Sequence, residues 1–380
     1  MTASLVDRVR ARLVADAAGA TPDRVAAALR AEGALLGDDS VLEVSGRLRR
    51  EMLGAGPLEP LLVLPGVTDV VVNGPQDVWL DRGDGLERAP IEFGSDEEVR
   101  ALAQRLAATA GRRLDDARPF VDARLPSGAR LHCVLPPVAM GATLISLRVP
   151  SPRGFTVDDL AERGSVDAAG AEVLRTIVAG RLAFLVSGGT GSGKTTILGA
   201  MLGEVPSRER IVLVEDSTEL DPDHPHVVRL QARPANTEGA GEVHLRDLVR
   251  QAMRMRPDRL VVGEVRGSEV VELLSAMNTG HEGGAGTVHA NSAADVPARL
   301  EALGLLAGLE RQAVHALIAA GLDVVLHLGR ENGVRVVDGL HVLDRGTSGL
   351  VSTIPALIRE HGRLVECPGM DQLAARLRHA

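Results

Sequence analysis

The sequence is poor in aromatic residues, which make up 1% of its 380 residues. Tyrosine is absent, Trp79 is the single tryptophan, and phenylalanine occurs four times. Proteins that hold single-stranded nucleic acid without sequence preference stack the bases on aromatic side chains. The composition therefore argues against such a binding surface, and it predicts cores built from Leu, Val and Ala.

Cysteines and long apolar runs are also scarce. Cys133 and Cys367 are the only two cysteines, and their separation builds neither a disulfide framework nor a metal site. The longest apolar stretch, residues 316–328, contains Asp323 and His327 and is too short to span a membrane. Charges are spread through residues 1–16, which is unlike a secretory signal. We therefore expect a cytoplasmic protein.

Basic residues are outnumbered, because 42 Lys and Arg face 51 Asp and Glu, for a net charge of −9. This balance argues against a general polyanion-binding protein, although it leaves a local basic groove open. Hydrophobic residues make up 45% of the chain, and the length suffices for two or three domains.

One glycine-rich stretch predicts a nucleotide site. Residues 188–195 fit the pattern G-x-x-x-x-G-K-[ST] between an apolar run at 182–186, expected to be a buried strand, and a helical pattern at 195–202. Such a loop wraps backbone N–H groups around phosphates at a helix N-terminus. Lys194 is predicted to reach the β- and γ-phosphates of ATP, and the Thr195 hydroxyl to bind Mg²⁺. The predicted cofactor-binding residues are Gly188, Gly189, Thr190, Gly191, Ser192, Gly193, Lys194, Thr195 and Thr196.

Changes in pattern along the chain predict four segments. Residues 1–55 form a helical N-terminal lead, and 56–149 a smaller α+β domain whose helix opens with a capping box at Ser95–Glu98. Residues 150–165 form a linker that begins with prolines and Gly154. Residues 166–380 form a wound α/β domain with a C-terminal extension. Its strands are expected at 182–187, 211–215, 259–265, 286–289 and 322–328.

Two predicted strands end in carboxylates. The strand at 259–265 carries Glu264 after Gly263, where a Walker B element usually has aspartate, so Glu264 alone must orient or deprotonate the attacking water. It could also contact the metal through water. The strand at 211–215 ends in Glu215, and Glu219 follows, so both are candidates for holding metal-bound or nucleophilic water. A solvated glutamate at 264 and a capped turn at 215–219 are the alternatives.

Residues 280–291 combine glycines with two histidines. His281 and His289 are eight residues apart without nearby cysteine, which does not match a zinc site. A histidine at the end of a strand could instead sense the γ-phosphate through a hydrogen bond, and a buried structural histidine is the alternative.

These elements, in this order, resemble the type II/type IV secretion ATPase superfamily. Residues 122–130, 245–250, 255–259 and 276–281 resemble its tight-adherence (Tad) branch, sometimes called conjugal-transfer-associated. The resemblance runs from about residue 56 to residue 328. Family members often have paired threonines where this chain has Gly286–Thr287.

The resemblance implies a RecA-like P-loop ATPase domain preceded by the smaller α+β domain, with six subunits in a ring. It implies that ATP and Mg²⁺ are used to drive Flp-type pilus assembly, or secretion, through an inner-membrane platform protein. A peripheral position at the inner face of the membrane stays open. The residues it assigns to hydrolysis are Lys194, Thr195 and Glu264, supported by Glu215, Glu219, His281 and His289, with Arg130 and Arg148 brought to the nucleotide from the smaller domain.

Three functions are weighed against the sequence. A secretion or pilus motor fits the motifs and the resemblance. A nucleic-acid translocase is the alternative suggested by the conjugal label, although the charge and the aromatic content argue against it. A nucleotide switch with little turnover is disfavoured by Glu264 and the acidic stretch. For the two arginines, the alternative is that each pairs with a nearby acid on its own domain.

Overall fold

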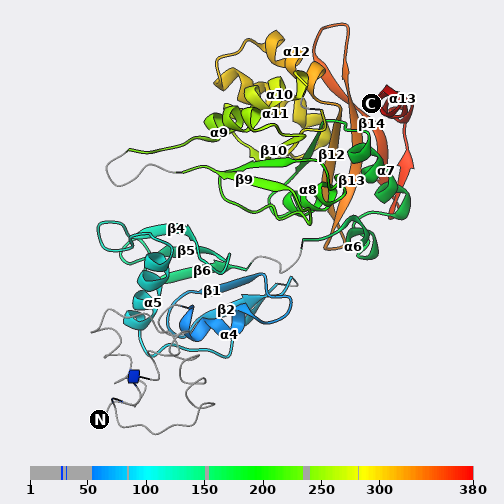
Figure 1. Cartoon of the computed structure of the whole chain (residues 1–380). Helices are drawn as coiled ribbons and strands as arrows, with labels where there is room; N and C mark the ends of the chain where they lie inside the picture. Colours follow the sequence, from blue (N-terminus) through cyan, green and yellow to red (C-terminus); the bar gives the residue numbers. More distant parts are fainter. Residues whose placement is uncertain are drawn as a thin grey trace. The chain divides into compact units, whose positions relative to one another are not determined.

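The structure is a computed structural model that describes residues 27–28, 31, 54–83, 85–149, 154–233, 240–280 and 282–379. The chain divides into two compact units, Met1–Pro152 and Arg153–Ala380, which are described separately below (Figure 1). Residues 27, 28 and 31 are helical, and most of the predicted helical lead at 1–55 lies outside the described residues.

The N-terminal unit is built on an antiparallel sheet. Its described strands run in the order β3-β2-β1-β6-β5-β4, and helix α5 (Asp96–Thr109) contributes Leu102 and Leu106 to the same core as the sheet. Side chains alternate between buried and exposed along most of these strands, as expected for a sheet with one solvated face. The strands are β1 (Asp69–Val72), β2 (Val78–Asp81), β3 (Leu86–Arg88), β4 (Phe120–Arg124), β5 (Arg130–Val134) and β6 (Leu144–Arg148).

The predicted start of α5 is confirmed, but its predicted capping box is wrong. The Ser95 side chain forms no cap hydrogen bond and instead interacts with Glu97. Glu98 Oε2 accepts a hydrogen bond from the Gly94 backbone N–H at 3.0 Å, one residue before the predicted partner. The three acidic residues of the first turn still favour a helix N-terminus, because they complement its dipole.

The C-terminal unit contains a mostly parallel sheet. Among the described residues its strand order is β15-β14-β13-β12-β7-β11-β10-β8-β9, with β12 through β9 parallel and β13 to β15 antiparallel. The strands are β7 (Phe184–Gly188), β8 (Ile211–Glu215), β9 (Val227–Gln231), β10 (Arg259–Val265), β11 (Ala285–His289), β12 (Val324–Glu331), β13 (Val334–Arg345), β14 (Val351–Glu360) and β15 (Arg363–Glu366).

Helices cover both faces of this sheet (Figure 1). Alternate residues of β7 point to opposite faces, so Phe184 and Val186 join one core cluster and Leu185 joins the other. Burial on both faces explains why the parallel strands have nearly continuous apolar sequences. The first face carries α6 (Val157–Glu162), α7 (Ala168–Ala179), α8 (Lys194–Gly203) and α13 (Met370–His379), and the second carries α9 (Leu245–Ala252), α10 (Glu269–Asn278), α11 (Val296–Leu306) and α12 (Arg311–Gly321).

Part of the predicted linker at 150–165 folds into the C-terminal unit. Thr156 and Asp159 form a capping box that starts α6, and Val157 and Leu160 are buried in the core. The prolines and Gly154 suggested a flexible segment, but the apolar spacing after Thr156 dominates. Residues 150–153 lie outside the described residues.

The five strands predicted for the C-terminal unit are confirmed, within two or three residues at their ends. Sequence reasoning missed β9 and β13 to β15, because β9 is only half buried and the later strands mix charged or polar residues with apolar ones. No helix of the described residues is long and apolar enough to cross a membrane.

Candidate nucleotide and catalytic site

The phosphate loop joins β7 to α8 at the carboxyl end of the parallel strands. Lys194 Nζ donates hydrogen bonds to the carbonyl oxygens of Gly188 at 3.0 Å and Gly189 at 2.9 Å. The Ser192 backbone N–H points to the same Gly189 oxygen at 3.3 Å. The loop is therefore closed around its own lysine, and the third N–H of the ammonium is left to donate to a phosphate.

Two glycines permit this tight loop. A Cβ on Gly188 would lie 2.7 Å from Ser192 Oγ and 2.9 Å from the Leu328 carbonyl oxygen. Gly193, which precedes α8, has φ +95°, a left-handed conformation that side chains rarely adopt. Both positions of the pattern are therefore required by geometry as well as by the approach of a phosphate.

A β-bulge sets the position of Glu264. Between two paired positions β10 advances three residues, from Val262 to Val265, while β11 advances two, so the Gly263–Glu264 step is irregular. Thr287 Oγ1 donates a 2.7 Å hydrogen bond to the Gly263 carbonyl oxygen and fixes this step from β11. Because of the bulge, the side chain of Glu264 points in a different direction from the one it would have in a regular strand.

Glycine is also required at 263 because of Glu215. A Cβ at Gly263 would lie 2.7 Å from Glu215 Cγ and 3.1 Å from its Oε1. Glu215 is buried and its Oε1 accepts hydrogen bonds from the backbone N–H groups of Glu219 and Leu220, each at 2.9 Å. Glu215 thus caps the turn after β8, as in the alternative given for residues 215–219. The exposed Glu219 lies near enough to Lys194 to raise the pKa of the lysine.

The charges around Glu264 favour its ionised form. Burial alone would raise the pKa of Glu264, but the hydrogen bond from Arg266, with 2.5 Å between Nη2 and Oε2, brings the pKa below its usual value. Lys194 and His289 act in the same direction. For Lys194, burial lowers the pKa and the charge of Glu264 opposes this shift. An ionised carboxylate therefore lies close enough to Lys194 for the two charges to interact.

Of the two predicted histidines, only His289 lies within the described residues. His289 ends β11, opposite Gly188 in the register, and lies close enough to Glu264 to interact with it electrostatically. His281 lies outside the described residues, while Gly283, which follows it, lies before the amino end of β11. A Cβ on Gly283 would overlap the buried Arg259 guanidinium, so this glycine serves packing.

Arg130 and Arg148 face each other across β5 and β6 on the exposed face of the N-terminal sheet. Arg130 Nη2 pairs with Asp122 Oδ2 at 2.8 Å, and Arg148 Nε with Asp69 Oδ1 at 3.5 Å. The alternative pairing with local acids is therefore present for both. The Arg148 side chain is 66% exposed, so its ion pair is weak and readily exchanged.

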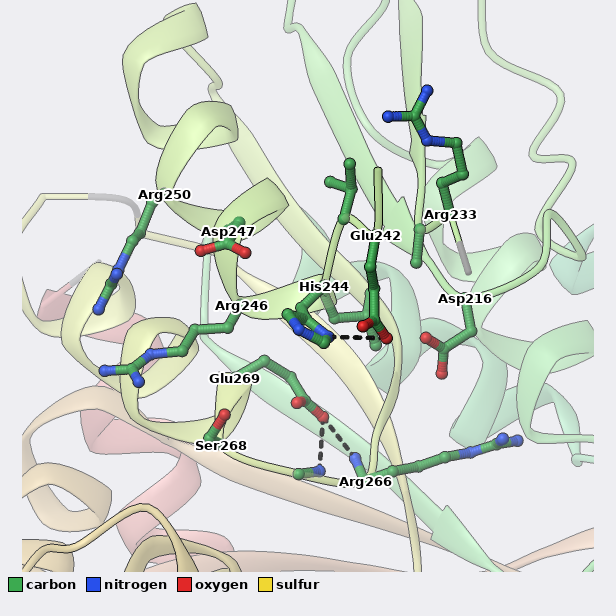
Figure 2. Close-up of a pocket in the computed structure, with 14 residues that line it drawn as sticks. Asp216, Arg233, Glu242, His244, Arg246, Asp247, Arg250, Arg266, Ser268 and Glu269 are labelled. Carbon is green, nitrogen blue, oxygen red and sulfur yellow. Dashed lines mark hydrogen bonds and ion pairs between the residues drawn. The ribbon is translucent and has the colours of Figure 1, made fainter. Parts of the chain in front are cut away.

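Sequence reasoning missed Arg266 and the cavity beside it. The cavity, of about 740 Å³, lies between β9, β10 and the amino ends of α9 and α10, and Asp216, Arg233, Arg246 and Arg266 line it (Figure 2). Glu269 Oε1 accepts hydrogen bonds from the backbone N–H groups of Arg266, at 2.6 Å, and Gly267, at 2.7 Å. This contact holds the segment that carries Arg266 to Glu264. An arginine two residues after the strand-end acid was the available signal.

A parallel α/β sheet with a glycine loop, a lysine and a strand-end carboxylate at its carboxyl edge defines the P-loop class of nucleotide-binding proteins. A family model described as "Type II/IV secretion system protein" matches residues 51–343, and the chain belongs to this family. A putative conjugal transfer protein of Mycobacterium tuberculosis is 58% identical over 307 residues, covering 79% of this chain and 87% of the relative. The type IV secretion system protein PtlH of Bordetella pertussis is 33% identical over 314 residues, covering 74% of this chain and 92% of the relative.

A solved structure confirms the predicted fold. The pilus retraction motor PilT with bound ADP superimposes with a TM-score of 0.55 at 18% identity, covering 85% of this chain and 86% of that chain. The architecture is thus a RecA-like α/β unit preceded by a smaller α+β unit.

Proposed function

We propose that this protein is a motor ATPase that hydrolyses ATP to drive pilus assembly or secretion. The observation that carries the proposal is the juxtaposition of the phosphate loop, Lys194 and the ionised Glu264 at one sheet edge. Family membership supports the secretion role. The finer proposals are the tight-adherence branch, a homo-hexameric ring, a cytoplasmic site of action and a platform protein at the inner membrane as partner.

Each residue has a defined part in this mechanism. Lys194, held by the two loop carbonyls, donates to the β- and γ-phosphates. Glu264 accepts the proton of the attacking water or orients it, which is typically worth about 10²–10⁴ in rate. His289 lies between Glu264 and the loop and is proposed to sense the γ-phosphate.

The residues present fit a magnesium ion. Thr195 offers a half-buried hydroxyl in the first turn of α8, and Glu264 and Glu219 place carboxylates near Lys194. These are hard oxygen ligands of the kind that Mg²⁺ prefers. When bound, the ion would neutralise charge on the phosphates. Thr195 would hold it directly and Glu264 through water, while Glu215 is committed to its backbone cap.

Two variants test the proposal because they separate binding from hydrolysis. Lys194→Ala is expected to lose ATP binding and hydrolysis together. Glu264→Gln should bind ATP nearly as the wild type does, while kcat falls about 10²–10⁴-fold. Nucleotide titration beside steady-state kinetics measures both. Near wild-type hydrolysis by Glu264→Gln would remove the residue from its assigned role.

A nucleic-acid translocase is the second candidate, and the name of the Mycobacterium tuberculosis relative is what favours it. The net charge of −9 and the low aromatic content oppose it. We expect the ATPase rate to change little when single- or double-stranded DNA is added at physiological salt. Several-fold stimulation that weakens steeply with salt would instead support translocation.

A further inference from the structure

A pair of arginines outside the predicted motifs contacts the phosphate loop. Arg330 is the second-last residue of β12 and Arg335 the second residue of β13, and the two face each other in the antiparallel register. Both donate to the carbonyl oxygen of Gly191, Arg335 from Nε at 3.0 Å and Arg330 from Nη2 at 3.2 Å. The contact joins parts of the chain separated by 139 and 144 residues.

This arrangement is electrostatically unbalanced. Like charges directly opposite one another destabilise a sheet. In the described part of the chain, neither Arg330 nor Arg335 forms an ion pair with an acid, and the adjacent Glu331 pairs instead with Arg359 at 2.7 Å. The two guanidinium groups share a single backbone carbonyl. An anion near the loop would balance them.

The contact also fixes the orientation of one peptide group. In a trans peptide the carbonyl of Gly191 and the N–H of Ser192 point in opposite directions. Because the arginines hold the carbonyl on the outer side, the Ser192 N–H is turned inward, toward the Gly189 oxygen that Lys194 also contacts. The Arg335 side chain further crosses Gly193, where a Cβ would lie 3.4 Å from its Cδ.

From these contacts, and on the basis of the proposed nucleotide-binding function, we infer that Arg330 and Arg335 are positioning residues for the phosphate loop. They keep the Ser192 N–H directed into the phosphate cradle, and they add positive charge outside it. Their ligand is the polyphosphate chain of a nucleoside di- or triphosphate, bound through Gly191–Ser192. Hydrolysis itself stays with Lys194 and Glu264, so the pair should govern affinity more than turnover.

The test is a comparison of affinities in the full-length protein. The double variant Arg330→Gln/Arg335→Gln should bind a fluorescent ADP analogue roughly tenfold more weakly, which corresponds to about 1.4 kcal/mol. KM for ATP should rise similarly while kcat stays within about threefold. The variant should also lose part of the salt dependence of binding, because charge interactions are screened by salt. The double variant Arg330→Lys/Arg335→Lys should keep more of the affinity than the glutamine variant does.

Arg345→Gln is the matched control, because Arg345 is an exposed residue of the same strand β13 and donates from Nε to the Gly349 carbonyl at 3.2 Å. It should bind nucleotide as the wild type does. Wild-type affinity in the double variant would overturn the inference, and so would a lower unfolding temperature with unchanged affinity. If the wild type binds ADP but hydrolyses no ATP, the motor proposal fails. The affinity comparison would still decide whether Arg330 and Arg335 position the phosphate loop. A wild type that binds no nucleotide overturns both.

Discussion

The two sheets of this protein place their functional side chains in different ways. In the antiparallel N-terminal sheet every second residue of β4 and β6 reaches solvent, so Arg148 lies within the exposed face. In the parallel C-terminal sheet β7 and β8 are buried along their whole length. Along strands buried in this way, charged groups can emerge only near the strand ends, and the phosphate loop follows the end of β7. Glu264 likewise lies at the second-last position of β10.

The two units also differ in the space around the glycines compared below. In the N-terminal unit Gly111 and Gly141 lie in turns, and a Cβ on either would meet no atom within 4 Å. In the C-terminal sheet Gly263 and Gly286 lie within strands, and a Cβ would approach a neighbouring strand to 2.7 and 2.8 Å. The parallel sheet therefore depends on missing side chains to fit its site together, whereas the antiparallel sheet does not.

The largest stability effect we expect follows from this contrast. Gly263→Ala should lower the free energy of unfolding by about 3 kcal/mol, because the added methyl overpacks the buried Glu215. Gly141→Ala in the other unit should cost only about 1 kcal/mol, from its left-handed backbone. Chemical denaturation of the full chain measures both. Equal losses at the two positions would contradict the contrast.

The second prediction concerns the exposed face of the N-terminal sheet. If its arginines serve hydrolysis, Arg148→Ala should lower kcat at least about tenfold, because a guanidinium neutralises charge on the transferred phosphoryl group. Nucleotide affinity should fall less. Arg88→Ala is a matched control, since Arg88 is an exposed arginine of the same unit that donates to the Gln76 carbonyl. An unchanged kcat in both Arg130→Ala and Arg148→Ala would contradict a role in hydrolysis and support the alternative, in which each arginine pairs with an acid of its own unit.

The smallest effect is on pH dependence. Because Arg266 keeps the pKa of Glu264 below its usual value, the carboxylate stays ionised to lower pH. In Arg266→Ala the remaining burial would raise this pKa, so the acid limb of kcat/KM should move to higher pH. Arg250→Ala should leave it unmoved, since Arg250 lines the same cavity but pairs with Glu272. A profile unchanged by Arg266→Ala would contradict the assigned electrostatics.

Local sequence patterns were sufficient to predict many elements of this protein. The glycine loop, the five apolar strands and the strand-end Glu264 are each encoded within a few consecutive residues, so periodicity and spacing predicted them. The same reasoning failed for the capping box at Ser95 and for the linker after Thr156, where two local signals competed. It also missed β9 and β13 to β15, whose mixed polarity gives no clear period.

By itself, then, the sequence determined that a phosphate loop follows a buried strand and that a carboxylate ends another. Only the tertiary structure decided how they work together. Gly263 must be glycine because Glu215 of the neighbouring strand fills its space, and Glu264 is turned by a bulge that exists only against β11. Gly191 is held by arginines more than 130 residues away. These are packing and pairing relations between strands, and spacing along one strand does not specify which neighbour lies beside it.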